Sequence, residues 1–147
     1  MTDTAAAPRV LFVCVRNGGK SQMAAGLMRH TAARSGFAVE VSSAGTNAGP
    51  SLNAQSVASL AQIGVDISDQ RTHQLTEQDV RNADLVVVLG SEAQVKPAGR
   101  SPVEVWETDE PSMRGIEGME RMSLIRDDIA KRVDDLVRRL RGADPAR

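Results

Sequence analysis

The amino-acid sequence predicts an α/β fold, with a single domain built on a four-stranded parallel sheet that carries helices on both faces. Three observations lead to this prediction. The chain has 147 residues, a length typical of one domain with its own core. Short apolar segments rich in β-branched residues alternate with segments of helical periodicity, as in βαβ units. Hydrophobic residues make up 41% and charged residues 25% of the sequence, as in ordinary globular proteins.

The N-terminal part predicts a strand, a helix and a second strand. Residues 9–15, RVLFVCV, form a short β-branched run that is typical of a buried parallel strand. Residues 20–36, KSQMAAGLMRHTAARSG, follow with an apolar helical face. Gly36 is expected to end this helix, because glycine readily adopts the conformation that follows a helix C-terminus. Residues 37–45, FAVEVSSAG, alternate between apolar and other residues before the pattern breaks, which predicts a strand followed by a loop.

The remaining elements repeat this alternation. Residues 51–64 carry apolar side chains at near-helical spacing, and residues 76–83 predict a short helix. Strongly apolar residues 84–90 and the shorter segment 103–106 predict two more strands. Residues 118–142 predict a long amphipathic helix, because charges cover all but one face. Its apolar positions are Met122, Ile125, Ile129, Val133, Leu136 and Leu140.

The chain ends and the overall charge set the expected location and partners. We expect residues 1–8 to form a flexible lead-in and residues 142–147 a tail to the single domain. The first nine residues contain an acidic residue and no apolar core, so they do not resemble a signal peptide. No segment approaches the ~18 apolar residues of a membrane span. The net charge of -1 gives no reason to expect nucleic acid as a partner. We therefore expect a cytoplasmic protein that contacts neither membranes nor nucleic acid.

Cys14 is the only cysteine of the chain. It cannot form an internal disulfide, and a zinc site would need more ligands than Cys14, His30 and His73 supply. We therefore predict no metal site. One other interpretation of Cys14 stays open at this point. It could be a small buried hydrophobic residue at the end of a strand. A nucleotide-binding P-loop fails on spacing, because the residue five positions before Gly19 is Cys14 and not glycine.

The loop after Cys14 has the features of an oxyanion site. It lies between the first strand and the first helix, at the sheet edge where α/β proteins usually bind ligands. Gly18 and Gly19 allow the backbone to curl so that successive N–H groups point inward, and the helix start adds positive potential. Such surroundings suit a tetrahedral oxyanion and favour a thiolate over a thiol. The predicted oxyanion-binding loop comprises Val15, Arg16, Asn17, Gly18, Gly19 and Lys20.

Residues 10–25, VLFVCVRNGGKSQMAA, together with SSAGT at residues 42–46, resemble the low-molecular-weight protein tyrosine phosphatases and the arsenate reductases built on the same fold. The family signature is a cysteine, five residues, an arginine and then serine or threonine; here the sequence has Cys14, five residues, Lys20 and Ser21. The resemblance implies that Cys14 is the nucleophile, assisted by Lys20 and Ser21. It continues through GVDIS, DLVVVLG and WETDEP and spans most of the chain.

Three departures from the family pattern bear on substrate and reductant. Lys20 replaces the signature arginine, so a point charge replaces a fork that binds two phosphoryl oxygens. The chain has no Tyr, and its Phe12, Phe37 and Trp106 all fall on predicted strands, which leaves few aromatic walls for a phosphotyrosine pocket. Residues 89–97, LGSEAQVKP, contain no cysteine where thioredoxin-coupled reductases of this fold carry two more thiols. An internal disulfide relay is therefore excluded.

Through NGGKSQMA and EPSMRGIEGMERM, the chain most resembles the actinobacterial arsenate–mycothiol transferases. This resemblance implies arsenate as substrate and mycothiol as co-substrate, with no bound cofactor. Cys14 would attack arsenate, mycothiol would take the arseno group from the sulfur, and a mycoredoxin would complete the reduction to arsenite. A small thiol would then replace the missing resolving cysteine. Two alternatives remain: a low-molecular-weight protein tyrosine phosphatase, or a catalytically silent oxyanion-binding module.

Several polar residues near the loop are expected to support it. The resemblance implies that Asn17 braces the loop. Ser21 is expected both to donate a hydrogen bond to the Cys14 thiolate and to cap the helix. Ser43 is expected to brace the loop from the second strand. Arg16 is expected to be solvated or to face mycothiol.

Two carboxyl groups compete for the role of general acid. The family carries its catalytic acid directly before a proline, and here Asp109 and Glu110 precede Pro111. Alignment on the Glu–Pro pair favours Glu110, with Asp109 as the alternative. The resemblance thus implies that one of them protonates the leaving group.

Overall fold

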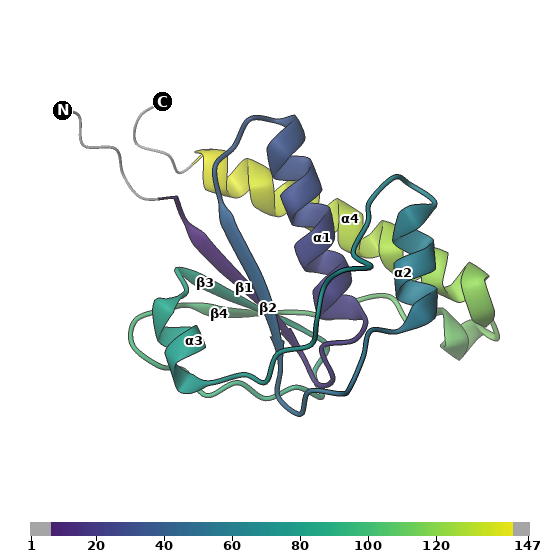
Figure 1. The fold of residues 1–147 in the computed structure, drawn as a ribbon, viewed down its shortest axis with the longest axis horizontal. Helices are drawn as coiled ribbons and strands as arrows, with labels where there is room; N and C mark the ends of the chain where they lie inside the picture. The colour runs from purple at the N-terminus through teal and green to yellow at the C-terminus, as the bar shows by residue number, and fades with distance from the viewer. Residues whose placement is uncertain (1–6, 143–147) are drawn as a thin grey trace.

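The computed structural model describes residues 7–142 and confirms the predicted α/β domain. Four parallel strands form one sheet in the order β2-β1-β3-β4 (Figure 1). Because β1 lies between β2 and β3, its carboxyl end at Cys14 is flanked by the loops that follow both neighbours. The strands are β1 (Arg9–Cys14), β2 (Glu40–Gly45), β3 (Leu85–Leu89) and β4 (Val103–Trp106).

The helices cover both faces of the sheet. On one face lie α1, α2 and α4, and on the other lies the short α3 (Figure 1). The sequence did not predict the short 3-10 helix η1 (Pro111–Arg114), which begins at a proline and is capped by the Glu110 side chain. The four α-helices are α1 (Lys20–Arg34), α2 (Ala54–Ala61), α3 (Glu77–Asn82) and α4 (Gly118–Gly142).

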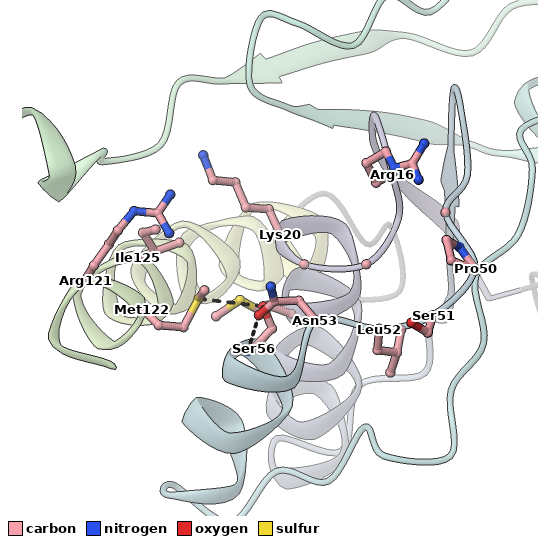
Figure 2. Close-up of a pocket in the computed structure, with 14 residues that line it drawn as sticks. Arg16, Lys20, Pro50, Ser51, Leu52, Asn53, Ser56, Arg121, Met122 and Ile125 are labelled. Carbon is pink, nitrogen blue, oxygen red and sulfur yellow. Dashed lines mark hydrogen bonds between the residues drawn. The ribbon is translucent and has the colours of Figure 1, made fainter. Parts of the chain in front are cut away.

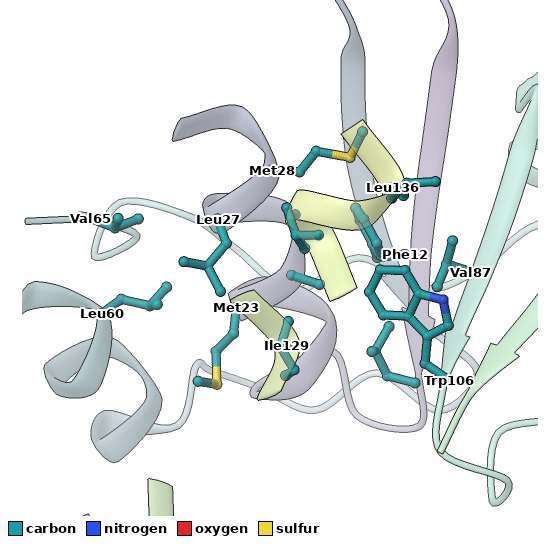
Figure 3. Close-up of a cluster of buried hydrophobic side chains, with 14 of the residues drawn as sticks. Phe12, Met23, Leu27, Met28, Leu60, Val65, Val87, Trp106, Ile129 and Leu136 are labelled. Carbon is teal, nitrogen blue, oxygen red and sulfur yellow. The ribbon is translucent and has the colours of Figure 1, made fainter. Parts of the chain in front are cut away.

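The main core lies between the sheet and the layer of α1, α2 and α4 (Figure 3). Phe12 of β1 and Trp106 of β4 pack there with ring centroids 5.8 Å apart. Met23 from α1 and Ile129 from α4 belong to the same cluster and are fully buried. On the opposite face, alternate residues of β1 and β3 pack with Val80 of α3. The rings of Phe12 and Trp106 are therefore part of the core.

The connection from α1 to β2 differs from the prediction. Gly36 follows α1 with a φ of 67°, the left-handed conformation that glycine adopts without strain. Phe37 was expected in the second strand, but its N–H donates to the Ala32 carbonyl at 2.9 Å. This bond satisfies a carbonyl near the end of α1. The backbone at Phe37 therefore still belongs to the turn that closes the helix. The strand therefore begins only at Glu40.

The predicted lead-in and tail fall mostly outside the described residues, which exclude residues 1–6 and 143–147. Of the lead-in, the carbonyl of Pro8 accepts a hydrogen bond from Glu40 N–H at 2.8 Å. At the other end, Gly142 belongs to α4 and not to the tail. Within residues 7–142, no helix combines the length and the apolar character needed to cross a membrane.

Candidate active site

The loop of residues 14–20 is held in shape by backbone hydrogen bonds from residues 46–53. Four loop carbonyls accept these bonds and are therefore turned toward that segment. The first turn of α1 has no side-chain cap, so its N–H groups remain available to an anion. The four bonds are Thr46 N to Cys14 O (3.0 Å), Asn47 N to Val15 O (2.8 Å), Gly49 N to Arg16 O (2.9 Å) and Asn53 N to Gly18 O (2.7 Å).

Gly45, the glycine of the SSAGT segment, permits the close approach of β2 to this loop. A Cβ atom at this position would lie 2.7 Å from the Val15 carbonyl oxygen and 3.0 Å from Asn17 Cβ. Any side chain would therefore push against the backbone of the loop. The segment after β2 can hold the loop only because position 45 carries no side chain.

Asn17 organises the interior of the loop. It is fully buried and has a φ of 57°, a left-handed conformation that asparagine tolerates better than most residues. The N–H of His73, which can only donate, bonds to Asn17 Oδ1 at 2.9 Å. This bond fixes the orientation of the amide, so Asn17 Nδ2 donates to Ser21 Oγ at 2.7 Å. Gln22 Nε2 also donates to Asn17 Oδ1, at 3.2 Å.

This network directs a proton toward the sulfur of Cys14. Ser21 Oγ lies 2.9 Å from Cys14 Sγ. Because Ser21 already accepts from Asn17 Nδ2, its own hydroxyl proton is left for the sulfur. The N–H of Asn17 donates to the same sulfur at 3.2 Å. Cys14 Sγ thus accepts two hydrogen bonds.

The structure separates the two roles expected of Ser21. The contact with Cys14 is present, but no side chain caps α1, so the capping role was wrong. The hydroxyl of Ser21 is fully buried and its two partners are Cys14 and Asn17. The Ser21 hydroxyl therefore contacts the nucleophile and does not cap the helix.

A pocket of about 440 Å³ opens beside the loop (Figure 2). Arg16 and Arg121 lie at opposite sides of it, with Lys20 between them. Arg16 is exposed, and its Nη1 donates to the Asn47 carbonyl at 3.3 Å. Within residues 7–142, no hydrogen bond or ion pair joins the Lys20 ammonium to another side chain. Four apolar residues also line the pocket, namely Met23, Leu52, Met122 and Ile125.

Lys20 is expected to supply charge rather than shape to oxyanion binding. Lys20→Met should weaken the binding of phosphate, sulfate and arsenate alike, by about 10- to 100-fold, because one charge-assisted contact is lost. Lys20→Arg restores the two-pronged contact and should raise the hydrolysis of an aryl phosphate from a low level. Titration calorimetry and phosphate release measure the two effects. Unchanged oxyanion affinity in Lys20→Met would show that the backbone alone makes the site.

The two candidate acids are both paired in the structure. Arg121 Nε and Nη2 donate to Glu110 Oε2 and Oε1, each at 2.8 Å, and Ser112 donates to Oε2 from its N–H and its hydroxyl. Hydrogen bonds from Arg121 and then from Ser112 lower the pKa of Glu110 to about 2. Asp109 is paired with Arg114 at 2.8 and 3.1 Å, and this hydrogen bonding lowers the pKa of Asp109.

These pairings describe the state of the two expected acids before Pro111. At neutral pH, both Glu110 and Asp109 are carboxylates, so in this arrangement neither holds a proton to donate. Glu110 instead caps η1 and joins it to α4. Among residues 7–142, no three His, Cys, Asp or Glu side chains gather as metal ligands would.

The brace expected from Ser43 was also wrong. Ser43 lies opposite Phe12 in the sheet register, two residues before the strand reaches Cys14, and within the described part of the chain its side chain makes no hydrogen bond to the loop. The bracing comes from backbone groups of residues 46–53 and of His73. Backbone donors carry no residue signature, so no sequence pattern could have identified them.

Comparison with known proteins agrees with this geometry. Residues 9–144 match the family described as low molecular weight phosphotyrosine protein phosphatase. The arsenate reductase of Halalkalibacterium halodurans is 34% identical over 130 residues, covering 84% of this chain and 91% of that protein. The arsenate reductase of Bacillus subtilis is 31% identical over 132 residues, covering 86% and 92%.

A solved structure extends the likeness to the whole fold. The thioredoxin-dependent arsenate reductase of Corynebacterium glutamicum superposes with a TM-score of 0.75 at 28% identity, covering 97% of this chain and 66% of that one. The match of fold and sequence thus runs over nearly all of the described residues. The chain belongs to the low-molecular-weight phosphotyrosine protein phosphatase family.

Proposed function

We propose that the chain is an arsenate reductase that acts as an arsenate–mycothiol transferase. The observation that carries this proposal is a lone cysteine whose sulfur accepts two hydrogen bonds at the base of an oxyanion loop. Arsenate reductases that match most of the chain, including the two described above, support arsenate as the substrate. The absence of a second cysteine from the sequence supports an external thiol as the acceptor.

The first step uses the loop and Cys14. Arsenate binds with its oxygens toward the N–H groups of residues 15–20, and Lys20 offsets part of its negative charge. The Cys14 thiolate attacks arsenic, so that an arsenic–sulfur bond forms. One arsenic–oxygen bond breaks, and that oxygen leaves as water with protons that the arsenate itself carries. Arsenic stays pentavalent in this step.

The later steps need two thiols from outside the chain. A mycothiol thiolate attacks the arsenic and displaces Cys14, which returns to its free form. A mycoredoxin thiolate then attacks the mycothiol sulfur. The electron pair of the sulfur–arsenic bond passes to arsenic, arsenite leaves, and a mixed disulfide holds the two oxidised sulfurs. We propose that mycothiol reaches Cys14 past Arg16, which stands exposed at the pocket edge.

A phosphatase is the second candidate, and the description of the family favours it. Two observations weigh against efficient phosphotyrosine hydrolysis. Phe12 and Trp106 are packed in the core and do not line the pocket. Glu110 is ionised and paired with Arg121. A silent oxyanion-binding module is the third candidate, since binding alone would need only the loop.

The experiment that tests the proposal asks which donor supplies electrons. Purified protein with arsenate is incubated with thioredoxin and its reductase, with mycothiol plus a mycoredoxin and its reductase, or with glutathione. Arsenite should form with mycothiol and mycoredoxin, weakly if at all with glutathione, and not with thioredoxin, because the chain forms no internal disulfide for thioredoxin to reduce. Mass spectrometry should find arsenic on mycothiol and a free Cys14.

A positive control makes the thioredoxin arm decisive. The Corynebacterium glutamicum enzyme, which is described as thioredoxin-dependent, should turn over in that arm under the same conditions. Arsenite production by the present chain with thioredoxin alone would overturn the transferase assignment. Release of phosphate from aryl esters without any thiol, with no arsenite in any arm, would instead favour the phosphatase. Inactivity in every arm would favour the silent module.

A further inference from the structure

We propose that Arg121 determines specificity by holding Glu110 away from acid catalysis, so that the site selects oxyanions that bring their own leaving proton. This inference rests on the proposed function, because it explains why such a site would reduce arsenate yet hydrolyse phosphate monoesters poorly. Arg121 acts through Glu110, and it is therefore a positioning residue. We call the Arg121–Glu110 pair the clamp.

The geometry of the clamp leaves Glu110 little freedom. Both guanidinium contacts are 2.8 Å long and reach different carboxylate oxygens, the two-pronged arrangement that fixes a carboxylate most firmly. Ser112 adds two further donors to Oε2, its hydroxyl at 2.7 Å and its N–H at 3.2 Å. The side chains of Arg121 and Glu110 are only 27% and 36% exposed. Arg121 supplies the two charged donors of the four, so the hold on Glu110 depends chiefly on Arg121.

The clamp stands at the edge of the site. Arg121 lines the same pocket as Lys20, Gly18 and Gly19, and Figure 2 shows its guanidinium at the side of the pocket opposite Arg16. Glu110 is therefore one residue removed from the pocket. A carboxyl released from Arg121 would become a titratable group next to a residue that lines the pocket.

The two substrate classes differ in their need for such a group. When a thiolate attacks a phosphate monoester, the phosphorus–oxygen bond to the alcohol breaks, and a basic alkoxide or phenoxide must be protonated as it leaves. An acid supplied by the protein typically accelerates this step by about 10²- to 10⁴-fold. Arsenate at neutral pH carries protons on its own oxygens, so its leaving oxygen departs as water without a protein acid. A clamped Glu110 thus slows monoester cleavage and leaves the attack on arsenate unhindered.

The alternative is that Arg121 merely fastens η1 to α4. If Arg121 only fastens the structure, its loss should change kcat/KM of all substrates by the same factor. If the clamp is correct, its loss should change kcat/KM most for the substrates with the most basic leaving groups. Phenyl phosphate and 4-nitrophenyl phosphate separate the two cases, because nitrophenoxide leaves unprotonated and phenoxide does not. The ratio of their kcat/KM values is insensitive to a general loss of active protein.

The experiment compares this ratio in the wild type and in Arg121→Met. The wild type should cleave phenyl phosphate far more slowly than 4-nitrophenyl phosphate. In Arg121→Met, the phenyl-to-nitrophenyl ratio should rise about 10-fold or more. The rate with phenyl phosphate should also fall as the pH rises through the pKa of the released Glu110, because the protonated form is the active one. Arg121→Lys keeps the charge without the two-pronged contact and should lie between.

Two further variants complete the test. Arg121→Met combined with Glu110→Gln should return the ratio to the wild-type value, because no acid remains to be released. Arg138→Met removes another arginine–carboxylate pair from α4, the exposed contact with Asp135, and should leave the ratio unchanged. Circular dichroism melting checks that each variant is folded.

Several results would overturn the proposal. They are an unchanged ratio in folded Arg121→Met, a gain that persists in the double variant, or a wild type that cleaves both esters equally well. None of these assays contains arsenate or an added thiol. Failure of the clamp would therefore leave the arsenate–mycothiol proposal standing, and failure of mycothiol to support turnover would leave the clamp standing.

Discussion

Cys14→Ser is expected to abolish arsenate turnover, with the rate falling by about 10³-fold or more. Cys14 is the only thiol of the chain, and a serine hydroxyl is not appreciably ionised at neutral pH. The smaller oxygen can still bond to Ser21 and to the N–H of Asn17, so the fold should persist. Arsenite production with mycothiol and a mycoredoxin measures the loss.

Oxyanion binding separates a lost nucleophile from a lost site. Calorimetric titration of Cys14→Ser with phosphate should give an affinity close to that of the wild type, because the N–H groups of the loop remain in place. The melting temperature should change little. Substantial arsenite production by this variant would contradict the assignment of Cys14 as the nucleophile.

Asn17→Asp is expected to lower turnover by about 10²- to 10³-fold, a loss of the size seen when a key hydrogen-bond donor is removed from an active site. Aspartate has the size of asparagine and also tolerates the left-handed φ of 57°. It cannot donate to Ser21, so the Ser21 hydroxyl would turn from Cys14 to the new carboxylate. The thiolate would lose a donor and gain a negative neighbour. A slower reaction of Cys14 with iodoacetamide at pH 7 would report the weaker nucleophile.

Asn47→Asp provides the matched control. Asn47 is exposed and holds the loop through its backbone N–H and carbonyl, so the same chemical change there should alter turnover and alkylation by less than about twofold. Equal losses in both variants would show that added negative charge near the loop, and not the amide network of Asn17, causes the effect.

The elements of the fold could be predicted well because their causes are local. The apolar stripe of α4 gave the bounds of residues 118–142, which the structure reproduces. The β-branched runs predicted β1 and β3 as buried strands, and the structure places both at the centre of the sheet. Phe37 was misplaced because a hydrogen bond that closes the end of α1 competes with the β pattern of its neighbours.

The site could be predicted only where a motif marks it. Cys14, Asn17 and Ser21 follow from the loop signature, and the structure brings them together. His73 is 56 residues from Asn17 and contributes only a backbone N–H, which no residue pattern records. Arg121 is one of many arginines on an amphipathic helix, and only the three-dimensional structure shows which one meets Glu110.

The backbone bonds that hold the oxyanion loop also couple the ligand to the folding equilibrium. Residues 14–20, residues 46–53 and His73 meet only in the folded chain, so the unfolded chain has no oxyanion site. By mass action, a ligand present at 100 times its dissociation constant would then add about 2.7 kcal/mol to the free energy of unfolding. Inorganic phosphate resembles arsenate in shape and charge and would exert the same effect. A cell rich in phosphate would thus keep more of this protein folded, even where arsenate is absent.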